Sequence, residues 1–394
     1  MRVDELENSG WRPVPFQCFV LKVQSRCNLS CDYCYLYEMG DQSWRRSSKV
    51  MSDEVIDLTA HRIGEHAHTH DVPLVDVVLH GGEPLLAGAE TLARVATSVR
   101  REAAAATQVR FTVQTNGTLL SDVMLEVLAE HDINVAVSID GDAEANDRHR
   151  RYADGRGSHE AVVKGLNALR TPGYRHLYSG LLCTIDLDND PVRTYRSLLE
   201  HEPPGMDFLL PHGNWSAPPP GWKDDPGSTP YGDWLIAAFD QWYGASTQQT
   251  AVRLFQDTLS LLFGGHAVSE QIGLDPADVV VVDTDGLVEQ VDTLKSAYDG
   301  ASATGLSVRD APFDAALRLP AMAARQLGVA ALSDACRGCA EREICGGGYY
   351  THRYREGSGF RNPTIYCADM LRFVGHVRAR ISADVARLSG GGTA

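Results

Sequence analysis

The sequence predicts an α/β fold built on a parallel sheet, followed by a smaller cysteine-rich domain. Six short apolar runs alternate with helical patterns over residues 16–213. Strands that alternate with helices form a parallel sheet with right-handed crossovers. Polar and glycine-rich segments follow the ends of these runs, where α/β barrels place their chemistry. A second cysteine group near the C-terminus predicts the additional domain.

The six predicted strands are short and rich in β-branched or aromatic residues, and most end in Gly, Asn or Asp. They comprise residues 16–24, 75–82, 109–117, 133–141, 177–186 and 206–213. Helical patterns lie between them, for example at residues 52–67 with Ser52 as the N-cap.

After residue 213 the sequence predicts a loop, several helices and a hairpin. Residues 214–232 are rich in Pro, Gly and Trp, which indicates a linker or a loop on the substrate side. Helices are expected at 231–245 and 249–264, then a hairpin with its turn at Asp285-Gly286, a helical run at 311–328 and a terminal helix at 366–388. The predicted domains are an N-terminal extension (1–15), the α/β domain (16–213), linker and helices (214–270) and the C-terminal domain (271–394).

Composition narrows the class of protein. The length of 394 residues suggests two domains, and a hydrophobic content of 43% is ample for a core. A formal charge of −16 argues against a nucleic-acid partner. No apolar run reaches transmembrane length and the N-terminus is polar, so we expect a cytoplasmic protein without a membrane partner. Seven of the nine cysteines are clustered, which favours metal ligation over disulfides.

The first cysteine group is Cys27, Cys31 and Cys34, spaced C-x3-C-x2-C on the loop after the first predicted strand. A closed structural metal site wants four protein ligands, whereas three leave one iron of a cubane cluster open. A zinc site or unrelated thiols are the alternatives. The other cysteines outside the two groups, Cys18 and Cys183, lie in apolar strands and are assigned no role.

Other motifs follow the next three strands. Gly81 and Gly82 allow the backbone to approach a ligand closely. The segments QTNG (114–117) and SIDG (138–141) end strands three and four. Arg150 lies in a basic run, and its guanidinium suits a bidentate carboxylate contact. A solvated charge run is the alternative for Arg150. The segment HAHTH (66–70) is expected on a helix end that faces water, without a metal.

The second cysteine group comprises Cys336, Cys339, Cys345 and Cys367. Four ligands fill every position of a cubane, so this site would have no open iron. Zinc is the alternative, because four-cysteine sites that begin C-x2-C commonly hold zinc.

Together these motifs resemble the radical S-adenosylmethionine (SAM) superfamily. The resemblance implies a partial (β/α)6 TIM-like barrel, and a [4Fe-4S] cluster on the first cysteine group whose open iron is chelated by SAM. Tyr33 matches the aromatic residue that the family keeps before its third cysteine. The expected SAM contacts are Gly81, Gly82, Glu83 and Pro84 near the amino group, Gln114, Asn116 and Ser138 along the ribose and methionine parts, and Arg150 at the carboxylate.

The C-terminal cysteines resemble the SPASM extension of peptide-modifying radical SAM enzymes, specifically its outer auxiliary cluster. Two [4Fe-4S] clusters are therefore expected in all. Val291 and Tyr349 stand where the inner auxiliary cluster takes cysteines, so that cluster is expected to be missing. Asp292 matches the aspartate that acts as general base in the related sulfatase-maturing enzymes; Asp283 and Asp285 on the same hairpin are the alternatives.

The segment DQSW (41–44) after the first cysteine group is similar to that of the FxsB-type peptide maturases, which form three-residue cyclophanes. The resemblance implies a ribosomal precursor peptide, a crosslink from an aromatic ring carbon to a Cβ through a 5′-deoxyadenosyl radical, and an external one-electron donor of flavodoxin or ferredoxin type. Another SPASM modification (thioether formation, epimerisation or formylglycine-type oxidation) is the alternative. A non-catalytic Fe–S or zinc protein is a further one.

Overall fold

A computed structural model describes residues 2–103, 105–225 and 227–390. The chain divides into two compact units, which we describe separately. The first contains residues up to Cys183 together with Pro276–Leu327, and the second contains Thr184–Asp275 and the residues from Gly328 onward. These units divide the chain at other places than the expected domain boundaries, which stay predictions.

The first unit is built on a parallel sheet. Strands β1 (Cys18–Gln24), β2 (Leu74–Gly81), β3 (Gln108–Thr115), β4 (Ile133–Ser138) and β5 (Tyr178–Thr184) are neighbours in chain order, and each pair is parallel. Their bounds agree with five predicted strands to within a few residues at each end. The predicted α/β fold with a mostly parallel sheet is thus confirmed.

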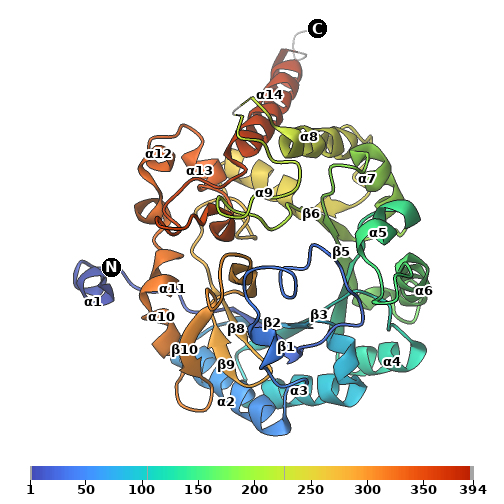
Figure 1. Cartoon of the computed structure of the whole chain (residues 1–394), viewed down its shortest axis with the longest axis vertical. Coiled ribbons are helices and arrows are strands. Elements are labelled where there is room, and N and C mark those ends of the chain that lie inside the picture. Colours follow the sequence, from blue (N-terminus) through green and yellow to red (C-terminus); the bar gives the residue numbers. More distant parts are fainter. Residues whose placement is uncertain (1, 104, 226, 391–394) are drawn as a thin grey trace. The chain divides into compact units, whose positions relative to one another are not determined.

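Helices cover one face of this sheet. They are α2 (Asp53–Thr69), α3 (Ala89–Glu102), α4 (Asp122–Glu130), α5 (Ala143–His149) and α6 (His159–Leu169), of which α2, α3 and α4 run along the outer side of the strands (Figure 1). On β2, Val75, Val77 and Leu79 are fully buried toward the helices. Alternation along a strand turns Val78 and His80 to the opposite face. That face carries the polar side chains of the candidate site.

The hairpin extends the same sheet. Strands β8 (Val279–Val282) and β9 (Leu287–Glu289) are antiparallel, and the Gly286 N–H donates to the Asp283 carbonyl, so the predicted turn is confirmed. β8 pairs in parallel with β1, and β10 (Ala303–Ser307) pairs with β9, giving the order β10-β9-β8-β1-β2-β3-β4-β5 in this unit. The sequence analysis grouped the hairpin with the C-terminal cysteines; in the structure its strands belong to the first unit.

Shorter helices complete the first unit. They are α1 (Val3–Asn8), α10 (Phe313–Leu317), α11 (Pro320–Ala324) and the 3-10 helices Ser43–Arg45, Pro84–Ala87, Arg175–Leu177 and Asp292–Ser296. The predicted helical run at 311–328 is therefore wrong as a single helix. It breaks at Leu319-Pro320, because the residue before a proline is disfavoured in the α region.

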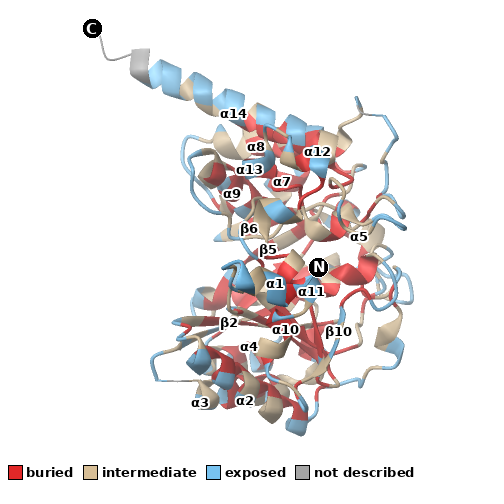
Figure 2. Ribbon diagram, turned by 90° about the vertical axis from the view of Figure 1, so that its left-hand side faces the viewer, coloured by how far each residue is buried: buried red, intermediate tan, exposed pale blue. Residues whose placement is uncertain are grey.

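The second unit is mainly helical. It contains α7 (Pro191–Leu199), α8 (Pro230–Tyr243), α9 (Arg253–Leu262), α12 (Asp334–Arg337), α13 (Arg342–Cys345), α14 (Cys367–Gly390), the 3-10 helices Gly328–Ala331 and Tyr350–Arg353, and the parallel strands β6 (Gly205–Leu209) and β7 (Ala251–Val252). The terminal helix was predicted at 366–388, and α14 confirms it. Figure 2 shows α14 mostly exposed toward its C-terminal end.

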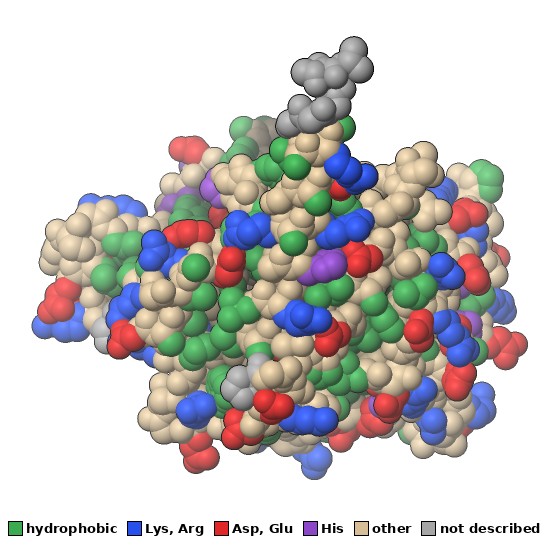
Figure 3. Space-filling view, turned by 90° about the horizontal axis from the view of Figure 1, so that it is seen from above, with side chains coloured by type: hydrophobic (Ala, Val, Ile, Leu, Met, Phe, Trp, Pro, Cys, Tyr) green, Lys and Arg blue, Asp and Glu red, His purple; other side chains and the backbone are tan. Residues whose placement is uncertain are grey.

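One face of the molecule is seen in a space-filling view. On the face seen in Figure 3, acidic and basic side chains are interspersed and no single sign dominates. None of the described helices has both the length and the apolar character needed to cross a bilayer.

Candidate functional site

The loop after β1 carries Cys27, Cys31 and Cys34, all partly buried. Burial raises the pKa of Cys27 to about 11 and that of Cys34 to about 12, and each thiolate raises the pKa of a neighbouring thiol further. Three thiols so close together, each resisting ionisation, need a positive centre to become thiolates. The donor set therefore fits an iron–sulfur cluster with three protein ligands.

Arg150 lies beside this loop, at the end of α5. It is only 8% exposed, so the alternative of a solvated charge is wrong for Arg150. Its Nη1 donates to the Tyr33 hydroxyl at 2.7 Å and lies 3.8 Å from Asp140 Oδ2, while the Tyr33 hydroxyl donates to that same oxygen. Among the described residues no hydrogen bond reaches the buried Nε of Arg150. The guanidinium thus has a donor to spare next to the thiols.

Hydrogen bonds to Glu83 link the loop after β2 to the end of β3. Its buried carboxylate accepts from the Thr115 hydroxyl at 2.6 Å, the Asn116 N–H at 2.8 Å and the Leu85 N–H at 3.0 Å. With its oxygens occupied in this way, Glu83 holds the shape of the loop. Pro84 follows as the first residue of a 3-10 helix.

Gly81 and Gly82 approach the cysteine loop too closely for any side chain. Gly81 has a φ of +141°, and a Cβ there would lie 1.9 Å from the Gln24 carbonyl oxygen. A Cβ on Gly82 would lie 2.0 Å from the Tyr37 hydroxyl. The Gly82 and Glu83 N–H groups donate to the carbonyls of Gln24 and Arg26, which ties this segment to the loop after β1.

The ends of β3 and β4 bring the remaining predicted SAM contacts together. The Gln114 amide donates to Ser138 Oγ at 2.9 Å. The Asn116 amide donates to Asn28 Oδ1 at 2.9 Å and lies 3.7 Å from Cys27 Sγ. Both sets lie at the carboxyl ends of parallel strands, which is where such sheets bind ligands.

Asp292 begins the 3-10 helix after the hairpin and is 5% exposed. Its Oδ2 accepts from the Tyr35 hydroxyl at 3.1 Å and lies 3.5 Å from His80 Nδ1. Tyr35 follows Cys34 directly, and His80 directly precedes Gly81, so both neighbours come from motif segments. The alternatives Asp283 and Asp285 make other contacts: Asp283 lies 3.7 Å from Lys22, and Asp285 accepts from the Leu287 N–H in the hairpin turn.

A network of buried charged residues lies near Asp292. Lys22 of β1 pairs with Glu289 at 2.9 Å, and Lys295 pairs with the other oxygen of Glu289 at 2.8 Å; Asp283 lies 3.7 Å from both ammonium groups. Burial alone would raise the pKa of Asp292, but the charges of Lys22, of His80 when it is protonated, and of Lys295 outweigh burial and lower it. Asp292 is therefore an anion at neutral pH.

Sequence reasoning missed this network. A lysine inside the apolar run FVLKVQ was a usable signal, because a buried lysine needs a partner. His80 directly precedes the glycine pair Gly81-Gly82, but the sequence analysis gave it no role. Tyr35 and Lys295 carried no sequence signal that separates them from ordinary surface residues.

The second cysteine group lies within the second unit, on α12, on α13 and at the start of α14. Burial and the neighbouring thiol of Cys367 raise the pKa of Cys345 to about 12, and the thiols of Cys336 and Cys339 act in the same way on Cys367. The four thiols are therefore close enough to influence one another's ionisation. Iron and zinc both fit four thiolates.

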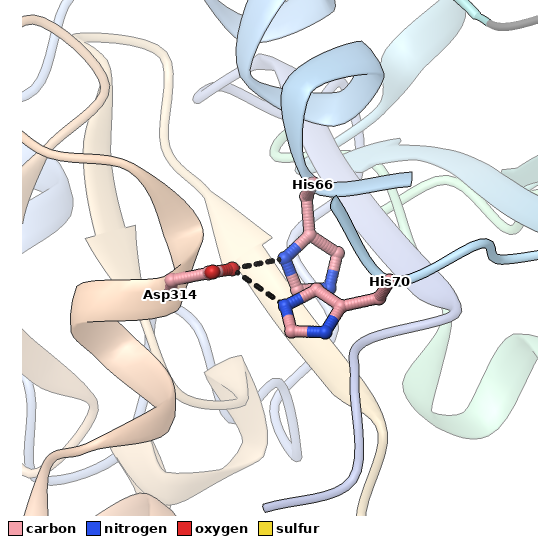
Figure 4. Close-up of side chains that lie close together, drawn as sticks. All are labelled: His66, His70 and Asp314. Carbon is pink, nitrogen blue, oxygen red and sulfur yellow. Dashed lines mark hydrogen bonds and ion pairs between the residues drawn. The ribbon is translucent and has the colours of Figure 1, made fainter. Parts of the chain in front are cut away.

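The segment HAHTH (66–70) differs from the expectation that it faces water. His66 is 2% exposed, and its Nδ1 and the Nε2 of His70 lie 2.7 and 3.0 Å from Asp314 Oδ1 on α10 (Figure 4). These three side chains could hold a metal by distance alone. However, His66 Nε2 accepts the Phe16 N–H at 3.0 Å, so Nδ1 must carry the ring proton. That proton makes His66 a donor to Asp314 and a poor metal ligand.

Comparison with known proteins finds similarity to one superfamily. Residues 21–198 match the family model of the radical SAM superfamily. The chain is 27% identical over 274 residues to the serine-type anaerobic sulfatase-maturating enzyme of Bacteroides thetaiotaomicron, an alignment that spans 64% of this chain and 63% of that enzyme. It is 24% identical over 291 residues to the cysteine-type enzyme of Clostridium perfringens, across 71% of this chain and 74% of that enzyme.

Solved structures share the fold. Native anSMEcpe with bound AdoMet and Cp18Cys peptide matches with a TM-score of 0.80 and 20% identity, across 94% of this chain and 99% of that chain. Streptococcus suis SuiB bound to precursor peptide SuiA matches with a TM-score of 0.58 and 13% identity, across 92% and 78%. The match to the radical SAM family model spans the first cysteine group, Gly81–Glu83 and Arg150, and the chain is similar in sequence to the anaerobic sulfatase-maturating enzymes.

Proposed function

We propose that this protein is a radical SAM maturase that modifies a ribosomally made precursor peptide. The observation that carries the proposal is the set of three thiols beside a buried arginine with a spare donor. A peptide substrate is supported by the curated relatives, which mature sulfatases, and by the structural neighbours anSMEcpe and SuiB, which were solved with peptides bound.

The proposed cofactor contacts follow the geometry. Cys27, Cys31 and Cys34 would hold the first [4Fe-4S] cluster, and the spare Nε–H of Arg150 would meet the SAM carboxylate. When bound, SAM and the reduced cluster supply a 5′-deoxyadenosyl radical that removes a hydrogen atom from a peptide carbon. The further contacts proposed are Gly81 and Gly82 through their carbonyls, Gln114, Asn116 and Ser138 through their side chains, and Tyr33, Glu83 and Pro84 as supports.

The finer proposal is that the product is a three-residue cyclophane. It is supported by the resemblance of the DQSW segment (41–44) to that of the FxsB-type maturases, and the structure holds this segment in place. Asp41 is buried and accepts from the Ser43 N–H at 2.8 Å and the Gly300 N–H at 2.7 Å. The Gln42 amide donates to the carbonyls of Tyr37 and Met39 at 3.1 Å. The segment thus fastens the cysteine loop to the chain that follows Asp292.

A formylglycine-type oxidation is the second candidate. Similarity to both serine-type and cysteine-type sulfatase-maturating enzymes favours it. Both reactions require that a proton leave the substrate after hydrogen abstraction, and the Asp292 region is the proposed acceptor in each. We propose a second [4Fe-4S] cluster on Cys336, Cys339, Cys345 and Cys367, and a flavodoxin- or ferredoxin-type protein as the external electron donor.

Co-expression with a candidate ribosomal precursor peptide tests the proposal. We expect the peptide to lose two hydrogens by mass, and the crosslinked residues to resist fragmentation between them. An aldehyde that reacts with a hydrazide probe would instead show formylglycine. The Cys27→Ala variant is the control and should make no modified peptide. A peptide that stays unmodified, with no 5′-deoxyadenosine formed by reconstituted enzyme and reductant, would overturn the proposal.

A further inference from the structure

His80 lies on the site face of the sheet, at the end of β2. It stands opposite Lys22 of β1 in the parallel register, and the pairing of Leu79 with Val113 places Gln114 on its other side. Side chains at matching register positions of neighbouring strands share one face. His80 therefore belongs to the same row as Gln114, a proposed SAM contact, although neither sequence reasoning nor the family match gave it a role.

The Nδ1 atom of the His80 ring faces Asp292. Nδ1 lies 3.5 Å from Asp292 Oδ2, and in the described part of the chain no hydrogen bond reaches it. This distance is long for a hydrogen bond, but such contacts are often long before the substrate binds. A proton on Nδ1 that points at the carboxylate leaves the lone pair of the neutral ring on Nε2.

His80 and Asp292 differ in exposure and in charge. The side chain of His80 is 22% exposed, against 8% for that of Asp292. Burial lowers the pKa of His80 below 6.5, with Lys22 acting in the same direction and Asp292 against it, so the ring is neutral at neutral pH. The pKa of Asp292 is lowered below 3.8. The imidazole is thus the more accessible of the two groups, and it is neutral where Asp292 is an anion.

We propose that His80 Nε2 takes the proton that completes the peptide modification, and that Asp292 is a positioning residue that holds the ring and stabilises its protonated form. This inference rests on the proposed function. The Tyr35 hydroxyl, at 3.1 Å from the same oxygen of Asp292, fixes the carboxylate in place.

The proposed step balances. One hydrogen atom leaves the peptide Cβ for the 5′-deoxyadenosyl radical, and the Cβ radical forms a bond to the aromatic ring carbon. The ring radical then gives one proton to His80 Nε2 and one electron to an acceptor of the iron–sulfur or flavin class, which restores aromaticity. The imidazolium, paired with the Asp292 carboxylate, returns its proton to water. The peptide has lost two hydrogens in total.

The direct test is His80→Gln, which keeps a polar side chain of similar length but removes the basic nitrogen. We expect 5′-deoxyadenosine to form still in the presence of precursor, while the ratio of modified peptide to 5′-deoxyadenosine falls by roughly 10²–10⁴, the usual effect of losing a general base. His68→Gln is the matched control, since His68 is exposed on α2, and its ratio should not change. A ratio that is unchanged in His80→Gln would overturn the inference.

The pH profile separates His80 from Asp292 as the base. With His80 as the base, the wild-type ratio should fall as the pH is lowered through the pKa of His80, below 6.5, and stay high above it. With Asp292 as the base, it would stay flat down to about pH 4, near the ordinary carboxylate value. In Asp292→Asn the imidazolium loses its carboxylate, so we expect the inflection to move to lower pH. A flat wild-type profile contradicts the inference.

A tautomer measurement does not depend on turnover. Histidine labelled with ¹⁵N in the reconstituted protein with oxidised clusters should show His80 as the Nδ1–H tautomer, with its signal identified by its loss in His80→Gln. Asp292→Asn should shift that tautomer balance. An Nε2–H tautomer in the wild type contradicts the inference. If wild-type enzyme makes no modified peptide while the tautomer is as expected, the proposed function fails and the dyad geometry stands.

Discussion

At the scale of single residues, burial decides which charges belong to the site. Arg148, Arg150 and Arg151 lie in one basic run, yet Arg150 is buried against Tyr33 and Asp140 whereas Arg151 is exposed. A buried guanidinium with an unused Nε–H is suited to a bidentate anion contact, because its planar donors are already in place.

Arg150→Lys should weaken SAM binding. Lysine keeps the charge but loses the planar fork, so we expect a loss of roughly 1.5–3 kcal/mol, the usual range for a hydrogen bond to a charged group. Equilibrium binding of SAM to the reconstituted protein measures it. Arg151→Lys is the control and should bind SAM as the wild type does. Equal affinities in both variants would remove Arg150 from the proposed SAM site.

At the scale of elements, two long-range pairings build the site. The pairing of β8 with β1 brings Asp283, Glu289 and Lys295 to Lys22. The packing of α10 on α2 brings Asp314 to His66 and His70. Each cluster buries charged or titratable groups, whose burial is costly unless they are paired with one another.

Lys22→Met should destabilise the first unit. Removing one ammonium leaves Glu289 and Asp283 buried with less compensation, which typically costs about 3–5 kcal/mol. Denaturant unfolding followed by circular dichroism measures the change. Lys49→Met is the control, because Lys49 is exposed, and its effect should be within about 0.5 kcal/mol. A Lys22→Met variant as stable as the control would show that the network contributes no net stability.

His66 should make stability depend on pH. Burial lowers its pKa in the folded state, so the unfolded chain binds more protons below pH 6.5 and stability falls as the pH is lowered through that value. Replacing His66 with Gln should make the thermal midpoint fall less steeply between pH 7.5 and 5.5, by up to the equivalent of about 1.4 kcal/mol per pH unit. His61→Gln, at an exposed position of α2, is the control. Parallel slopes in wild type and His66→Gln would contradict this assignment.

At the scale of the whole molecule, two cysteine groups determine the metal content that we expect. The first group has three cysteines and the second has four, and the resemblance to SPASM proteins implies no third cluster, because Val291 and Tyr349 stand at the cysteine positions of that cluster. The two groups fall in different compact units, so each can be changed by its own substitutions.

Anaerobically reconstituted protein should hold about eight irons, one cubane for each cysteine group. Changing Cys27, Cys31 and Cys34 to Ala together should leave about four irons and abolish SAM cleavage. Cys18→Ala is the control, because Cys18 belongs to neither group, and it should keep both clusters. Metal analysis and EPR of the reduced protein measure this. Zinc in the second site, or a third cluster, would contradict the prediction.

The sequence by itself determined the strand positions and the hairpin turn and marked the two cysteine groups, because each follows from a local pattern. Alternating apolar residues placed β1 to β5, Asp285-Gly286 set the turn, and cysteine spacing marked the two groups. The break between α10 and α11 at Pro320 was also readable locally and was missed.

Only the tertiary structure decided which polar groups are buried and which neighbours they have. Lys22 and Glu289 lie 267 positions apart, and Tyr35 and Asp292 lie 257 apart, so no local period connects them. The same holds for His66. The polar segment around it predicted exposure to water, but the structure buries its ring against Asp314 and the Phe16 N–H. Burial and pKa depend on which residues pack against each other in the fold. A local sequence pattern does not show these partners when they are far apart in the chain.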